Sequence, residues 1–231
     1  AVVQNIGAYG SELAAMTASA LVLDRRDPSG APRTWGPDRL RHGYRTSALK
    51  NIDRYVVLSV RLRLRRSALS GPVRYQELAR ALGIALGDAA PSRRVREAVL
   101  ALRRSKGMVL DPGDHDTWSA GSFFTNPVLP ALPAALAHLP ADHPAIWPAG
   151  AEAVGAGAPA AGVKISAGWL IRQAGFEPGF ALPGSAAGLS AKHVLALTNR
   201  GGATGAQVRE LADHVAATVA AACGVALHPE P

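Results

Sequence analysis

Four short segments carry residue types that can bind an anion or move a proton. Residues 4–10, QNIGAYG, place a glycine on either side of an aromatic ring, so a flat or phosphorylated ligand can approach the backbone closely. Arg45 follows Tyr44, and a guanidinium can hold a carboxylate through two parallel hydrogen bonds. Ser122 lies between a glycine and two phenylalanines, and Glu230 lies in HPEP. Each segment taken alone also fits a structural role, as a tight turn or an exposed polar side chain.

The composition predicts a folded chain with anionic partners. Of the 231 residues, 48% are hydrophobic and 18% are charged, which excludes a disordered tail or a fibrous repeat. The net charge of +8 favours phosphates, carboxylates or nucleic acid without choosing among them. Cys223 is the only cysteine, which excludes an internal disulfide, so a reducing compartment, the cytoplasm, is expected. No apolar run approaches the roughly 20 residues of a membrane span, and no membrane association is expected.

Three further features suggest a binding site but have a simpler explanation. Residues 92–106 are rich in arginine, as in nucleic-acid-binding proteins, but few aromatic residues are available for base stacking, which favours a solvated polar face. His138 and His143 have no obvious third ligand nearby, so no metal site is predicted. GGATGA suits a helix N-cap at Thr204 better than a phosphate loop. No Walker or GxGxxG motif is found after a strand, which argues against an ordinary nucleotide-triphosphate or Rossmann site.

The first hundred residues begin with predicted antiparallel strands. Alternation with arginines places Val60, Leu62 and Leu64 on the buried face of a strand at 54–66 whose other face is wet. Segments 19–24 and 32–35 are separated by a proline- and glycine-containing turn and therefore predict a hairpin.

Helical spacing follows in the rest of the chain. Helices are predicted near 75–82, 92–106 and 166–176, the last of them capped by Ser166. A long amphipathic helix is predicted to start at Thr204, whose spacing to the following glutamine matches a capping box.

The order of these elements predicts the fold class. Short strands are expected at 121–129, 193–199 and 224–231, and weak order is expected at 130–163. Strands and helices mix without regular βαβ alternation, so the predicted class is α+β. A boundary between two units of comparable size is predicted near 106–111.

Several motifs in series are more specific than any one of them. Along the whole chain, the strings QNIGAYG, YR.S, RSK, LDP, AGSFF.NP, AGWLI.QAGF, LTN.GGAT and GV.L.PE follow one another. In this order they resemble the UDP-N-acetylenolpyruvoylglucosamine reductases, also called UDP-N-acetylmuramate dehydrogenases, which are flavoenzymes of peptidoglycan precursor synthesis. Members of that family begin with an FAD-binding portion that this sequence does not contain. The resemblance therefore implies that residues 1–107 are the later part of the FAD-binding domain and that residues 108–231 are the substrate-binding domain and the start of a C-terminal tail.

The resemblance implies a reaction. It is the FAD-dependent reduction, by NADPH, of the enolpyruvyl group of UDP-N-acetylglucosamine enolpyruvate to UDP-N-acetylmuramate. Hydride from flavin N5 adds to the outer vinyl carbon, which leaves negative charge on the inner carbon and its carboxylate. Arg45 matches the arginine of the GYR motif and Glu230 the glutamate of the terminal PE, and both are implied to stabilise this charge. Ser122 matches the serine of AGSFF and is implied to give its proton to the inner carbon.

The same resemblance implies the binding residues. The inner flavin contacts are matched by Gln4, Asn5, Gly7, Ala8, Tyr9 and Gly10. The substrate contacts are matched by Tyr44, Tyr75, Lys106, Asn126 and Gln173. The expected partners are the UDP-sugar and NADPH, with no nucleic acid, no metal and no membrane, and the expected form is a cytoplasmic monomer that is inactive as the isolated fragment. The alternative, motivated by the charge of +8, is a noncatalytic basic module that binds anions or nucleic acid.

Overall fold

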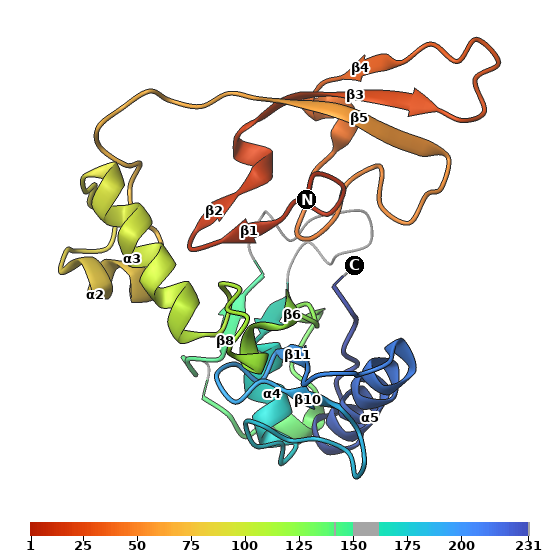
Figure 1. The fold of residues 1–231 in the computed structure, drawn as a ribbon. Helices are drawn as coiled ribbons and strands as arrows, with labels where there is room; N and C mark the ends of the chain where they lie inside the picture. Colours follow the sequence, from red (N-terminus) through yellow and green to blue (C-terminus); the bar gives the residue numbers. More distant parts are fainter. Residues whose placement is uncertain (141, 150–161, 231) are drawn as a thin grey trace. The chain divides into compact units, whose positions relative to one another are not determined.

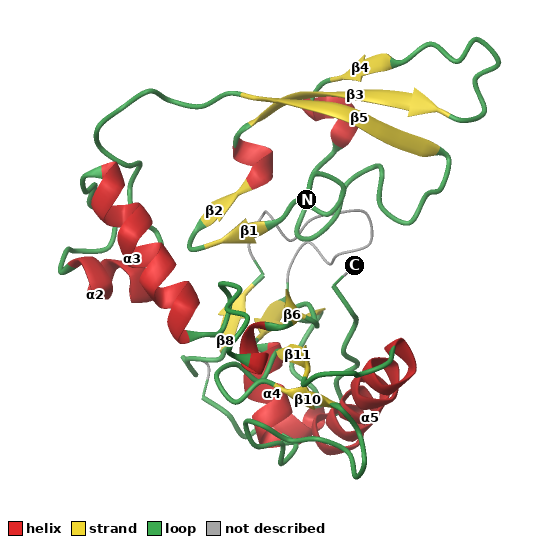
Figure 2. Ribbon diagram, in the orientation of Figure 1, coloured by secondary structure: helices red, strands yellow, loops and turns green. Residues whose placement is uncertain are grey.

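The computed structural model describes residues 1–140, 142–149 and 162–230 (Figure 1). It divides into two compact units, residues 1–99 and the described residues from 100 to 230. The division lies inside helix α3 (Ser92–Ser105), earlier in the chain than the predicted boundary. Both units combine helices with antiparallel strands (Figure 2), so the predicted α+β class is confirmed.

The first unit is built on a three-stranded antiparallel sheet. Its strand order is β4 (Arg33–Trp35), β3 (Thr17–Asp24) and β5 (Tyr55–Leu62). The pairing of β3 with β4 confirms the predicted hairpin. A small core covers one face of this sheet, and its buried members are Ala20, Val22, Trp35, Leu40 from α1 (Pro37–Leu40), and Leu49.

The burial predicted for β5 is wrong. The strand ends at Leu62 rather than continuing to residue 66, and Leu62 is 44% and Leu64 69% exposed. The pairing of β5 with β3 shifts register between Leu21 and Val22, which breaks the simple alternation of buried and exposed positions. Alternation therefore identified the strand but not the face that the core covers.

A second, smaller hairpin precedes the sheet. Strands β1 (Gly7–Ala8) and β2 (Ser11–Glu12) pair antiparallel, with Ala8 opposite Ser11. The connecting residues Tyr9 and Gly10 both have positive φ, at 52° and 78°, as a two-residue turn of type I′ requires. The 3₁₀ turn η1 (Leu13–Ala15) then leads into β3.

Two helices complete the first unit and both were predicted. Helix α2 (Gln76–Leu82) buries Leu78, Ala79 and Leu82. Helix α3 begins at Ser92 and contains no buried residue, and Gly107 follows it with a φ of 67°. The arginines of α3 thus form a largely solvated face.

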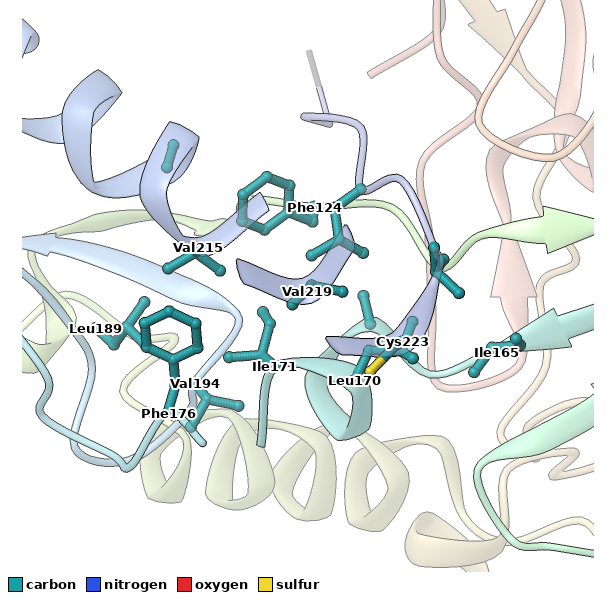
Figure 3. Packing of buried hydrophobic residues seen from close by; sticks show 14 of the residues in the cluster. Phe124, Ile165, Leu170, Ile171, Phe176, Leu189, Val194, Val215, Val219 and Cys223 are labelled. Carbon is teal, nitrogen blue, oxygen red and sulfur yellow. The ribbon is translucent and has the colours of Figure 1, made fainter. Parts of the chain in front are cut away.

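The second unit has a larger core, shown in Figure 3. Helix α4 (Ala167–Gln173) contributes Leu170 and Ile171, and helix α5 (Gly205–Cys223) contributes Val215 and Val219. These side chains are fully buried. They pack with the sheet of β10 (Ala187–Leu189), β11 (Ala196–Asn199) and β6 (Ser119–Ser122), in that strand order.

Another small sheet corrects the weak order predicted at 130–163. Its order is β7 (Val128–Leu129), β9 (Val163–Ile165) and β8 (Ile146–Pro148). The described part of the segment also holds the 3₁₀ turn η3 (Ala134–Leu136), and Leu136, Ala145 and Ile146 are buried. Apolar anchors at these positions give order that the alanine- and proline-rich composition conceals. Residues 141 and 150–161 lie outside the described residues.

Two other strand predictions need correction. Strand β6 begins at Ser119 and ends at Ser122, earlier than the predicted 121–129, and β7 covers only the end of that range. Residues 224–230 form no regular strand but make a single bridge, between Phe124 and Pro229. Proline has no N–H to donate, so continuous pairing stops there.

Both predicted helix caps are confirmed. The Ser166 hydroxyl accepts a hydrogen bond from the Trp169 N–H at 3.2 Å. Thr204 and Gln207 form a full capping box, in which each side chain accepts from the other residue's backbone N–H. Local sequence therefore sets where α4 and α5 begin.

Replacing Thr204 by alanine should lower the free energy of unfolding of the second unit by about 1 kcal/mol, because α5 loses its cap. Urea denaturation followed by far-UV circular dichroism measures this loss. Thr218→Ala is the matched control, since Thr218 lies inside α5 and its hydroxyl donates to the His214 carbonyl of the preceding turn. Equal losses in the two variants would show that the capping box does not stabilise the start of α5.

Candidate functional site

Asn5 is the most completely bonded residue of the QNIGAYG segment. It is 1% exposed and has a φ of 45°, a left-handed conformation that asparagine tolerates better than most residues. Its Nδ2 donates to Glu12 Oε2 and to the Gly43 carbonyl, both at 3.0 Å. Its Oδ1 accepts from the Ala14 N–H at 2.8 Å. One buried side chain thus joins the β1–β2 hairpin to a turn distant in sequence.

That turn carries Arg45. The backbone of Gly43 and Thr46 pairs in both directions, with Gly43 N–H to Thr46 O at 3.1 Å and Thr46 N–H to Gly43 O at 3.3 Å. Arg45 has a φ of 50°, and the Lys50 ammonium donates to its carbonyl at 2.9 Å. A tight turn and a lysine therefore fix the backbone from which the guanidinium extends.

The Arg45 guanidinium reaches back to the same N-terminal segment. Its Nη2 donates to the Gly7 carbonyl at 2.8 Å and its Nη1 to the Asn5 carbonyl at 3.3 Å. Its Cζ lies 5.2 Å from the centroid of the Tyr44 ring. The structure thus brings Arg45 and Tyr44 together with the predicted flavin-contacting segment.

Two further hydrogen bonds join the segment to residues 42–47. The Ser47 hydroxyl donates to the Val3 carbonyl at 2.5 Å, and His42 Nε2 bonds to the Val2 carbonyl at 3.1 Å. Burial lowers the pKa of His42, although the bond to Val2 acts in the opposite direction. We call residues 2–7, residues 42–47 and the bonds between them the clasp.

The aromatic ring of the segment contacts a predicted substrate residue. Tyr9 and Tyr75 meet edge to face, with ring centroids 5.3 Å apart. A Cβ at Gly10 would lie 3.1 Å from Arg74 Cβ, so the hairpin turn packs closely against the residue before Tyr75. Tyr75 is 38% exposed and immediately precedes α2.

The hairpin offers surfaces that suit a flat cofactor. Ala8 and Gly10 are exposed and have little or no side chain, so a planar ring system can lie against their backbone. Gln4, at the start of the same segment, is half-buried. The Asn5 side chain is already bonded to three protein groups. The residues present thus fit a flavin through the backbone of the hairpin rather than through the Asn5 amide.

In the second unit, Ser122 and Glu230 lie on adjacent extended segments. Ser122 ends β6 opposite Ala196 of β11, and the Phe123 N–H donates to the Leu195 carbonyl at 2.7 Å. On its other side, the Phe123 carbonyl accepts from the Glu230 N–H at 2.6 Å. Ser122 and Glu230 are both half-buried. A backbone hydrogen bond therefore joins Glu230 to Phe123, the residue that follows Ser122.

The predicted substrate residues of this unit lie in three separate parts of the chain. Asn126 Oδ1 accepts from the Ala167 N–H at 2.9 Å and so fixes the start of α4. Lys106 follows α3 and is half-buried, and Gln173 is the exposed last residue of α4. Asn126 therefore has a clear structural role, whatever its Nδ2 group contacts.

Sequence reasoning missed the partners that hold the clasp. These partners bond to residues at irregular distances along the chain, so no helical or strand pattern reveals the contacts. They are Glu12, Gly43, Ser47 and Lys50. Motif strings alone did not mark them as part of one structure.

Other polar groups give no sign of a second site. Within the described residues there is no cluster of three His, Cys, Asp or Glu side chains suited to a metal ion. His143 Nδ1 accepts from the Ala145 N–H, and its ring packs against Trp169. No helix in the described parts of the chain is both long and apolar enough to span a bilayer.

Fold and site together define a two-unit α+β protein whose polar motifs lie on loops and short strands, as in many ligand-binding α+β proteins. The family model for the C-terminal domain of UDP-N-acetylenolpyruvoylglucosamine reductase matches residues 111–231. The chain is therefore a member of the UDP-N-acetylenolpyruvoylglucosamine reductase family.

Curated relatives extend the similarity to the rest of the chain. The reductase of Nocardia farcinica is 52% identical over 99% of this chain, and that of Mycolicibacterium smegmatis is 49% identical over 99%. This chain spans 58% and 62% of their respective lengths. A solved structure of the Thermus caldophilus reductase matches with a TM-score of 0.55 and 22% identity, covering 100% of this chain and 57% of that one, which supports the fold.

Replacing Gly7 by alanine should destabilise the clasp. The new Cβ would lie 2.8 Å from Glu12 Cγ, 3.0 Å from the Ser11 carbonyl oxygen and 3.2 Å from Arg45 Nη1. Overpacking of this kind costs about 1–3 kcal/mol. Thermal unfolding measures the effect, with Gly71→Ala as control because a Cβ there meets no atom within 4 Å. A Gly7 variant as stable as the Gly71 variant would contradict the tight packing.

The clasp should also weaken in mild acid through His42. Because burial lowers its folded pKa below the usual 6.5, its contribution to stability is full above pH 6.5 and is lost as the pH falls through the folded pKa. Urea denaturation at pH 8 and pH values near 5 measures this, with His42→Gln as the comparison. An identical loss on acidification in both proteins would exclude His42 as the source.

Proposed function

We propose that this chain is part of a flavoenzyme that uses NADPH to reduce UDP-N-acetylglucosamine enolpyruvate to UDP-N-acetylmuramate in peptidoglycan precursor synthesis. Family membership supports this proposal, as do the curated relatives, which are named UDP-N-acetylenolpyruvoylglucosamine reductases. The observation that carries it is the backbone hydrogen bond from the Glu230 N–H to the carbonyl of Phe123, the residue after Ser122. Because the chain spans 58–62% of those relatives, the activity is proposed for the longer protein.

Arg45 would stabilise the charge that the reaction creates. Addition of hydride to the outer vinyl carbon leaves negative charge on the inner carbon and the attached carboxylate. A preorganised guanidinium offers parallel donors to such an oxyanion without reorganising during the reaction. The clasp and Lys50 supply this preorganisation. Lys50 bonds to the Arg45 carbonyl, and the Asn5 and Gly7 carbonyls accept from two nitrogens of the Arg45 guanidinium.

Ser122 would act as the proton donor to the inner carbon. A serine hydroxyl is a weak acid in water, but a carboxylate-conjugated carbanion is a very strong base, so transfer in this direction is favourable. Glu230 would act with Arg45 on the charge that forms at the inner carbon and its carboxylate. Its backbone N–H donates to the carbonyl of Phe123, the residue after Ser122.

The backbone of residues 4–10 would bind the inner part of FAD, while the Asn5 side chain is bonded to protein groups. The exposed Ala8 and Gly10 backbone and the Tyr9 ring present a surface on which the isoalloxazine can lie. When bound, FAD reduced by NADPH supplies the hydride. The chain's own part is to orient the ligand and to exclude side reactions.

The remaining predicted residues would hold the sugar nucleotide. Tyr75, kept in place by Tyr9, would close over the diphosphate, and Tyr44 would lie beside the carboxylate held by Arg45. Lys106 and Asn126 would meet phosphate or carboxylate oxygens, and Gln173 would contact the same ligand. The net charge of +8 fits such anionic ligands. The proposed enzyme is a cytoplasmic monomer.

A noncatalytic anion-binding module is less well supported. The first unit has a cavity of about 270 Å³ lined in part by Arg33, Arg39 and Arg54. Two of these arginines are already paired, Arg54 with Asp24 at 2.5 Å and Arg33 with Asp27 at 2.7 Å. The Arg54 hydrogen bond lowers the pKa of Asp24 to about 2, so this carboxylate stays charged and offsets its partner near neutral pH.

The longer protein should bind FAD, and its continuous oxidation of NADPH should require the enolpyruvyl sugar nucleotide. Absorbance of bound flavin and the loss of NADPH absorbance measure the two properties. The chain of residues 1–231 alone should show little or no turnover, because part of the flavin site is expected elsewhere. Flavin-loaded protein without turnover would refute the proposed reaction, and tight salt-dependent binding of nucleic acid in preference to UDP-sugars would favour the alternative.

Ser122→Ala should slow product formation by about 10²-fold or more, the scale of lost general-acid catalysis, while flavin reduction by NADPH stays near normal. Stopped-flow measurement of the two half-reactions separates these effects. Ser185→Ala serves as the control, because the Ser185 hydroxyl accepts a local bond from the Ala187 N–H and Ser185 has no role in the proposed reaction. Equal loss in both half-reactions of the Ser122 variant would point to misfolding rather than to a missing proton donor.

A further inference from the structure

The hydrogen-bonding capacity of the Asn5 side chain is used within the protein. A primary amide has two N–H donors, and those of Asn5 have two acceptors, Glu12 Oε2 and the Gly43 carbonyl. The amide oxygen accepts from Ala14 N–H. Because the residue is 1% exposed, a bound flavin has little access to this amide.

The Asn5 contacts act on both ends of the Arg45 side chain. Gly43, bonded by the Asn5 amide, begins the turn from which Arg45 extends. The Asn5 and Gly7 carbonyls accept from the guanidinium at the other end. Asn5 is therefore bonded to the Arg45 turn through its side chain and to the Arg45 guanidinium through its backbone.

We infer that Asn5, held by Glu12, is a positioning residue for Arg45. Its amide fixes the turn, and its left-handed backbone points the carbonyl at the guanidinium. The catalytic consequence depends on the proposed function, because it takes Arg45 to stabilise the enolate. A displacement of about 1 Å in such a group costs about 10²-fold in rate.

Asn5→Asp tests this inference with a minimal change of shape. Aspartate tolerates positive φ, as asparagine does, and keeps an oxygen for the Ala14 N–H. It removes both N–H donors and sets a second carboxylate against Glu12. Asn51→Asp is the matched control, since Asn51 is exposed, has a φ of 59°, and makes no side-chain hydrogen bond with any described residue.

The first measurement needs no cofactor or substrate. In the chain of residues 1–231, the rate at which phenylglyoxal modifies Arg45 is followed by peptide mass spectrometry. The rate should rise about tenfold in the Asn5 variant, the scale of lost buried hydrogen bonds to a charged group, and stay unchanged in the Asn51 variant. Hydrogen exchange at the Ala14 amide reports whether the hairpin remains folded. Unchanged Arg45 reactivity with a protected Ala14 amide would overturn the inference.

The second measurement uses the longer flavoenzyme. Asn5→Asp should slow reduction of the enolpyruvyl group by about 10²-fold while flavin reduction by NADPH stays near normal. Combined with Arg45→Ala, it should add little further loss, because the two residues act through the same group. Additive losses, or equal losses in both half-reactions, would overturn the positioning role. If the wild-type enzyme does not turn over, the proposed function fails, and Arg45 reactivity still decides whether Asn5 positions that side chain.

Discussion

A buried amide in a left-handed backbone is the constraint on which the rest of the first unit's site depends. Burying a polar side chain is unfavourable unless its donors and acceptors are satisfied, and Asn5 meets this condition with three hydrogen bonds. Those bonds fix the start of the β1–β2 hairpin relative to the turn of Gly43–Thr46. Arg45 then finds two carbonyl acceptors already in place. The cation is thus oriented by the chain before any ligand arrives, which is the condition for effective electrostatic stabilisation of a developing charge.

The second unit achieves similar order by a different physical means. Phe124, the neighbour of the Ser122–Phe123 pair, is 2% exposed, and Val225 and Leu227 of the C-terminal segment are buried in the same core. Apolar packing therefore brings the two segments together, and a few backbone bonds then set their register. Ser122 and Glu230 lie on the two segments that this packing and these backbone bonds join. A cavity-forming change at Phe124 would therefore disturb the pair without touching either polar group.

The elements most accurately predicted from the sequence are those determined by neighbouring residues. The capping box of Thr204 and Gln207 and the Ser166 cap involve residues three positions apart, so their geometry is contained in the local sequence. Burial along β5 depends on a register shift against β3, which alternation in one strand cannot reveal. The motif order identified Arg45, Ser122 and Glu230 as candidates, but the carbonyls that accept from the Arg45 guanidinium lie 40 and 38 residues away from it in sequence. Similarity of motifs thus selects chemical groups, whereas tertiary hydrogen bonds decide how they are oriented.

The balance of polar and apolar contacts makes the two units unequally sensitive to substitution. The core on the first unit's sheet is small, with few buried side chains around Trp35. On the other face of β5, Val56 is 41% exposed and Leu58 is 48% exposed. Little apolar burial is therefore available to compensate if a clasp hydrogen bond is lost, because hydrophobic stabilisation scales with buried area. In the second unit, the fully buried side chains of α4 and α5 can tolerate the loss of a single surface hydrogen bond. The geometry around Arg45 thus rests on directional polar bonds, whereas apolar packing brings the segments of Ser122 and Glu230 together and backbone bonds set their register.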